Sequence, residues 1–163
     1  MKLIIHDLTE KEAAIFDFKD NTVISDNGNI KRCTGCFGCW VKTPGQCIIH
    51  DGYENLGKKF SECDQLIIIS KCVYGSYSPF IKNVLDRSIS YVHPFFEIRK
   101  GEMHHKRRYA NKVHLVVYMY GGMTDSEKET AEELVKANAL NLNCESFEIH
   151  FAKEVLEFGG ELI

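Results

Sequence analysis

The chain has 163 residues, the length of one ordinary globular domain, with 44% hydrophobic and 26% charged residues, which excludes a disordered or collagen-like chain. Its formal net charge of −3 argues against a general nucleic-acid binder, and no apolar run reaches the roughly 20 residues that cross a bilayer. Because Asp7 interrupts the apolar residues that follow Lys2, we do not expect Met1–Asp7 to act as a signal peptide. We therefore expect one domain, residues 1–163, in the cytoplasm, without nucleic-acid or membrane partners.

Five segments have the character of β-strands. Three of them, 3–5, 66–69 and 113–120, are nearly continuous apolar runs, which are typical of strands covered on both faces of a parallel sheet. The segments 22–25 and 147–151 are shorter or alternate apolar with polar residues, as edge strands do. This pattern predicts the strand order 2-1-3-4-5 of a flavodoxin-like fold, an α/β three-layer sandwich around a five-stranded parallel sheet.

Helical patterns separate these strands. The first crossover has room only for a shortened helix of barely two turns, within residues 10–16. A later helix begins at Ser78–Pro79 and ends at His93–Pro94. Two further helices begin at capping boxes, which pair Asp51 with Glu54 and Thr124 with Glu127.

An insertion follows the third helix. Residues 95–105 predict a β-hairpin that turns at Lys100–Gly101, and in it the adjacent His104 and His105 point in opposite directions. The basic run 104–108 receives a cofactor phosphate or forms a solvated face, and the second interpretation is the commoner one.

Four of the seven cysteines lie within fifteen residues, at the spacing C-x2-C-x2-C-x7-C. They are Cys33, Cys36, Cys39 and Cys47. Four thiolates at such short spacing suit an iron–sulfur cluster or a zinc ion, and the glycines between them permit sharp turns. The alternative is a set of reduced thiols with a redox or loop-shaping role, and a disulfide framework is not expected from an odd number of cysteines without a secretion signal.

Two segments carry a family resemblance. Residues 33–40 with 45–51, and then 70–78 with Lys82 and Asp86–Arg87, resemble the group of NAD(P)H-dependent FMN reductases and iron–sulfur flavoproteins. This resemblance implies FMN bound at the carboxyl ends of the strands, NAD(P)H as reductant, and a homo-oligomer, a dimer or tetramer, with the flavin near the subunit boundary. For the iron–sulfur branch it implies a [4Fe-4S] cluster on the four cysteines. We favour the absence of that cluster, because the same spacing occurs in relatives that hold only flavin.

The resemblance also indicates which residues contact the flavin. They follow the first, third and fourth strands and are Thr9, Tyr74, Gly75, Ser76, Tyr77, Ser78, Tyr120, Gly121 and Gly122. The alternative is a capped turn at residues 74–78 and an ordinary strand-to-helix turn at Gly121–Gly122. The first of these loops departs from the family, because Asp7, Glu10 and Glu12 would repel the FMN phosphate. A lysine, Lys71, also replaces the proline that is usual after the third strand.

These observations predict an FMN-dependent oxidoreductase that passes electrons from NAD(P)H to a small acceptor. The flavin performs the hydride chemistry, so no side chain is assigned a catalytic role. The alternative is a protein of the same fold that has lost FMN and serves as a metal-binding, iron–sulfur-binding or interaction module.

Overall fold

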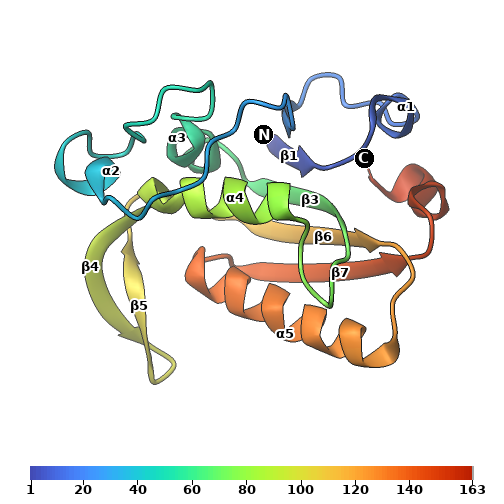
Figure 1. Cartoon of the computed structure of the whole chain (residues 1–163). Helices are drawn as coiled ribbons and strands as arrows, with labels where there is room; N and C mark the ends of the chain where they lie inside the picture. Colours follow the sequence, from blue (N-terminus) through green and yellow to red (C-terminus); the bar gives the residue numbers. More distant parts are fainter. Residues whose placement is uncertain (163) are drawn as a thin grey trace.

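A computed structural model describes residues 1–162 of the chain. Its centre is a five-stranded parallel sheet with the order β2-β1-β3-β6-β7, so the predicted order 2-1-3-4-5 is confirmed (Figure 1). The strands are β1 (Lys2–His6), β2 (Thr22–Ser25), β3 (Gln65–Lys71), β6 (His114–Tyr120) and β7 (Ser146–Ala152). Four of them cover the segments that their apolar patterns indicate, and β6 begins one residue later than predicted, at His114. That residues 1–163 form one domain stays a prediction, and Ile163 lies outside the described residues.

One face of the sheet carries the larger hydrophobic core. It is covered by α3 (Leu56–Ser61), α4 (Pro79–Arg87) and α5 (Asp125–Asn141). Alternate residues of the central strands point into this core, as the period of two in a strand requires. They include Leu3, Ile5, Leu66, Ile68, Leu115 and Val117, each at most 1% exposed.

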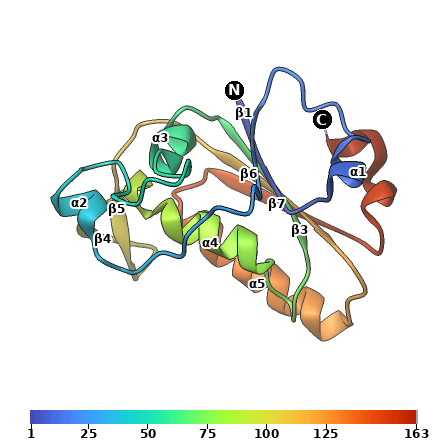
Figure 2. The same cartoon turned by 45° about the horizontal axis from the view of Figure 1, so that its top comes forward.

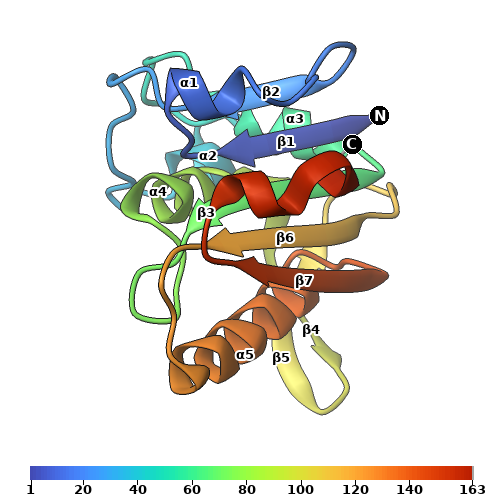
Figure 3. The same ribbon diagram turned by 90° about the vertical axis from the view of Figure 1, so that its right-hand side faces the viewer.

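The opposite face has a thinner cover (Figure 3). It consists of α1 (Glu10–Ala13) and the C-terminal 3₁₀ segment η2 (Val155–Leu162), whose Val155 and Phe158 pack with Phe16 against the sheet. The predicted shortening of the first crossover helix is therefore confirmed, since α1 has only four residues.

Local capping signals explain where two helices begin. Ser78 caps α4 with Pro79 in the first turn, and Thr124 and Glu127 form the predicted capping box of α5. The prediction of a helix start at Asp51 is wrong, because α3 begins after Asn55. The helix α4 also ends earlier than expected, at Arg87, and the 3₁₀ turn η1 (Ile89–Tyr91) follows it.

The predicted hairpin is present as β4 (Val92–Arg99) and β5 (Glu102–Arg107), which form a separate two-stranded sheet. Lys100 and Gly101 make its turn with φ angles of 51° and 84°, the left-handed conformation that a tight two-residue connection needs. His104 and His105 point to opposite faces, as predicted: His104 contacts Asn141, whereas His105 contacts the ring of Trp40.

Candidate functional site

Asp7 joins the carboxyl ends of three neighbouring strands. It follows β1, and its Oδ2 accepts a 2.9 Å hydrogen bond from the Lys71 N–H at the end of β3. Its Oδ1 accepts a 3.0 Å bond from the Tyr120 hydroxyl at the end of β6. Burial and the nearby Asp7 charge raise the pKa of Tyr120, so its hydroxyl keeps its proton and acts as the donor. The three loops after β1, β3 and β6 therefore meet at one carboxylate, at the edge where parallel sheets bind ligands.

Beyond Asp7, the start of α1 satisfies its hydrogen bonds within the helix itself. Thr9 caps α1, and both its N–H and its hydroxyl donate to Glu12 Oε2, at 2.8 and 2.7 Å. These bonds from Thr9 hold the pKa of Glu12 below its ordinary value. The donors of Thr9, predicted to contact a cofactor, are thus occupied by a side chain of the same helix.

The segment after β3 makes a tight turn from Val73 to Ser76, closed by hydrogen bonds of 2.8 and 3.1 Å between their backbones. Tyr74 stands at its apex with 88% of its surface exposed. Gly75 has a φ of 73°, and a Cβ there would lie 2.7 Å from Cβ of Thr130. The absence of a side chain at Gly75 therefore serves close packing against α5.

Two of the predicted flavin contacts are inside the protein. Tyr77 is only 1% exposed and belongs to the main core, so its ring presents no face to a ligand in this arrangement. Ser78 is buried as well, and its hydroxyl caps α4 through the Ile81 N–H. In the turn itself, Tyr74 is exposed, Val73 and Ser76 are half-buried, and Gly75 is a third predicted contact that is buried.

Gly121 and Gly122, after β6, line a hollow of about 630 Å³ with residues that follow β7. The N–H of Gly121 donates to the carbonyls of Ala152 and Lys153, both at 3.1 Å, so it is not free for a ligand. A Cβ at Gly122 would meet nothing within 4 Å, which leaves the backbone open to solvent there.

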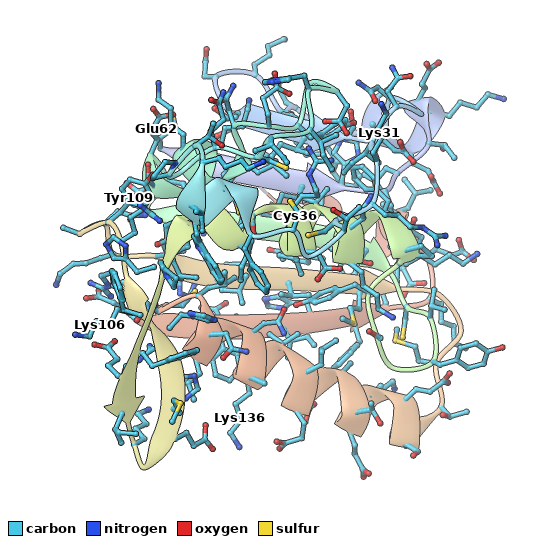
Figure 4. The ribbon with its side chains drawn as sticks, turned by 60° about the vertical axis from the view of Figure 1, so that its left-hand side comes forward. Lys31, Cys36, Glu62, Lys106, Tyr109 and Lys136 are labelled. Carbon is cyan, nitrogen blue, oxygen red and sulfur yellow. The ribbon has the colours of Figure 1, made fainter. Side chains whose placement is uncertain are left out.

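The four clustered cysteines line one cavity of about 460 Å³, which also receives residues from the last turns of α4 and α5. Cys33 and Cys36 are exposed at its mouth, and Cys39 and Cys47 are buried (Cys36 is labelled in Figure 4). The short helix α2 (Gly38–Val41) begins inside the cysteine segment.

The cysteines have different acidities. A hydrogen bond from the Gly38 N–H, aided by the Thr34 hydroxyl, lowers the pKa of Cys36. Burial, together with the nearby Cys47, raises the pKa of Cys39. Among the described residues, no group of three or more metal-ligating side chains is placed to hold a single metal ion. That the four cysteines bind metal stays a prediction.

A buried arginine supports the cysteine segment. Arg87 of α4 lines the cavity, and its guanidinium donates to both oxygens of Asp51 at 2.8 and 3.0 Å. It also donates to the carbonyl oxygens of Lys31 and Ile49, on either side of the cysteines. Arg87 is 1% exposed, so it is an interior residue of the fold and not a surface charge.

The sequence analysis missed the buried hydrogen bonds of Arg87, although the residue spacing in α4 indicates that Arg87 is buried. Phe80, Val84 and Arg87 have the spacing i, i+4, i+7, which places all three on one helix face, and that face is buried. It also treated Asp7 only as a repelling charge and missed its bonds to the next strands.

The helix α2, which belongs to the cysteine segment, lies at the opposite end of the sheet from the carboxyl ends of the strands (Figures 1 and 2). Both α4 and α5 start at the carboxyl ends of the strands and run back along the sheet. Their last turns, which line the cavity, therefore lie near the amino ends of the strands. We keep the name crevice for the region bounded by Asp7, the turn 73–76 and Tyr120.

Comparisons with known proteins agree with this architecture. A curated relative, an iron–sulfur flavoprotein of Archaeoglobus fulgidus, is 30% identical over 87 residues, which are 53% of this chain and 39% of the relative. The chain thus matches well under half the length of that protein.

Solved structures show the same fold at low identity. An FMN-dependent NADH-azoreductase from Bacillus anthracis, solved with FMN, is 13% identical with a TM-score of 0.55, over 93% of this chain and 86% of that one. An NAD(P)H:quinone oxidoreductase from Methanothermobacter marburgensis is 12% identical with a TM-score of 0.56, over 93% and 85%.

The sequence profile that describes the NADPH-dependent FMN reductases matches residues 3–151, from the first strand to the last. This match spans every strand of the parallel sheet, the cysteine segment and the three loops that meet at Asp7. The chain belongs to the NADPH-dependent FMN reductase family.

Proposed function

We propose that the protein is an FMN-dependent oxidoreductase that passes electrons from NAD(P)H to a small acceptor. The observation that carries this proposal is the family match over residues 3–151, together with the convergence of the loops after β1, β3 and β6 on Asp7. The names of the similar structures, an azoreductase and a quinone oxidoreductase, support the same class of reaction. The alternative, a module that has lost flavin, is not favoured by these comparisons.

The residues of the crevice fit the two parts of FMN unequally. The exposed ring of Tyr74 and the open backbone at Gly122 suit a flat ring system beside the carboxyl ends of the strands. The loop after β1 does not fit a phosphate in the same way, because Thr9 already donates to Glu12. We therefore assign the ring-binding role to the segments after β3 and β6.

The protein's own contribution is to position the flavin, which supplies the hydride and electron chemistry when bound. Asp7 holds the ends of β3 and β6 through Lys71 and Tyr120, so that both ring-binding segments keep a fixed spacing. No catalytic side chain is assigned, in agreement with a reaction carried out by the cofactor.

We further propose that the protein is a cytoplasmic homo-oligomer, a dimer or tetramer. The free thiols of its cysteines suit a reducing compartment. No helix in the described part of the chain is long and apolar enough to cross a bilayer. The apolar face of the hairpin supports self-association, because Phe96, Ile98 and Met103 share it and are 56–68% exposed.

Two measurements test the proposed activity. Purified protein is titrated into FMN and into riboflavin, and the quenching of flavin fluorescence reports binding. Oxidation of NADH and NADPH is then followed at 340 nm with and without added FMN, using a quinone as acceptor. Binding together with flavin-dependent oxidation supports the proposal, whereas the absence of binding to either flavin contradicts it.

A further inference from the structure

The loop that follows β1 presents two carboxylates to the crevice, those of Asp7 and Glu12. We propose that these two carboxylates exclude a phosphate from this loop, so that the protein recognises a flavin by its ring system and gains no affinity from the 5′-phosphate. The inference rests on the proposed flavin-dependent function and concerns which part of the flavin is recognised.

Glu12 occupies the donors that a phosphate would need. A bound phosphate requires N–H and hydroxyl donors, and Thr9 supplies one of each. Both are engaged by Glu12 Oε2, at 2.8 and 2.7 Å, and the Glu12 N–H in turn donates to the Thr9 hydroxyl at 3.4 Å. A phosphate could enter only by displacing a carboxylate that is covalently part of the same helix and therefore always present at high local concentration.

Hydrogen bonds from β3 and β6 fix the position of the Asp7 carboxylate. The Lys71 N–H donates to both of its oxygens, at 2.9 and 3.2 Å, and hydroxyls of Ser70 and Tyr120 donate at 3.4 and 3.0 Å. Because these donors belong to β3 and β6, the carboxylate cannot rotate away without breaking the contacts between strand ends. Its negative charge therefore remains beside the crevice whatever ligand enters.

The charge of Lys71, beside this loop, is already compensated. The Lys71 ammonium is close enough to Glu12 to contribute to the lowered pKa of that carboxyl. The Asp7 and Tyr120 groups face the same space, because the charges of Asp7 and Glu12 both contribute to the raised pKa of Tyr120. Asp7, Glu10 and Glu12 thus carry three negative charges against the two positive charges of Lys11 and Lys71, and a dianionic phosphate would add to this net negative charge.

The flavin would therefore be held by stacking on its ring system and by backbone contacts, and not by its 5′-phosphate. Ligands of this crevice would then be flavins with or without a phosphate, and they would exchange with free flavin. Removing the charge of Glu12 should release the Lys71 ammonium and weaken the hold on the Thr9 donors, because a neutral amide oxygen accepts a hydrogen bond less strongly than a carboxylate.

The test compares FMN with riboflavin on the full chain by fluorescence quenching. Wild-type protein should bind the two with affinities within about twofold. Glu12→Gln keeps a residue that supports a capping box but removes the charge, and it should tighten FMN binding about tenfold while changing riboflavin binding less than about twofold. Adding Lys71→Gln to that variant should reverse most of the gain.

Glu10→Gln is the matched control, because it removes an exposed charge from the same short helix, whereas the Thr9 donors bond to Glu12. It should change FMN binding by less than about threefold. The inference is overturned if wild-type protein binds FMN at least about tenfold more tightly than riboflavin, or if Glu12→Gln and Glu10→Gln act equally. Failure of every variant to bind either flavin would instead overturn the proposed function itself.

Discussion

Arg87 and Asp51 form a bidentate ion pair between α4 and the end of the cysteine segment, with 0% and 3% of their side chains exposed. Asp51 also accepts hydrogen bonds from the N–H groups of Lys31 and Tyr53, so its carboxylate is fully satisfied within the protein. The pair therefore fixes a segment that has little regular structure of its own, and four cysteines lie in that segment.

Replacing Arg87 with methionine should destabilise the protein by about 3–5 kcal/mol, because it leaves the Asp51 carboxylate buried without its partner. Urea denaturation measures this loss as a change in the free energy of unfolding. The double variant Arg87→Met with Asp51→Leu should recover part of the loss, since it removes the unpaired charge. If the double variant loses the sum of the two single losses, the pair does not act as a unit.

The same pair predicts how stability depends on pH. Arg87 holds the pKa of Asp51 well below its ordinary value of 3.8. A carboxyl whose pKa is lower in the folded state stabilises the fold above its unfolded pKa and loses this contribution as the pH falls. The free energy of unfolding should therefore decrease below about pH 4, and Arg87→Met should flatten this decrease. If the free energy of unfolding falls equally steeply with pH in the wild type and in Arg87→Met, the lowered pKa of Asp51 is not caused by Arg87.

The cysteines should differ in reactivity in the order set by their exposure and acidity. Under anaerobic conditions, iodoacetamide should modify Cys36 first, because it is exposed and its pKa is lowered. Cys63 and Cys144 should react last, since burial raises their pKa values to about 11 and about 12.

Mass spectrometry of peptides after timed alkylation measures this order, and Cys36→Ser is the control for the fast site. We expect the same anaerobic protein to contain no iron. About four iron atoms per chain with broad visible absorption would show instead that the four thiols bind a cluster.

Self-association should depend on the apolar face of the hairpin. Ile98→Lys together with Met103→Lys introduces two charges on side chains that are 68% and 66% exposed, and should lower the molar mass found by light scattering. Leu156→Lys is the matched control, because Leu156 is 63% exposed but lies in the C-terminal segment. An unchanged mass in the double variant would place the interface elsewhere.

The fold was predictable because its determinants are local in the chain. The apolar runs place β1, β3 and β6 at the centre of the sheet, Ser78–Pro79 starts α4, and Lys100–Gly101 turns the hairpin. Each of these signals acts within a few residues of the chain, so the sequence alone shows it.

The site was less predictable because its key contacts join distant residues. Asp51 looks like a helix cap from its neighbours, but its partner is Arg87, 36 residues further on. Likewise, Tyr77 is three residues from the exposed Tyr74, yet it points into the core. The sequence by itself determined the family, the strand order and the acidic character of the loop after β1. Only the tertiary structure decided which charges are buried together, because burial and pairing depend on which elements pack against each other.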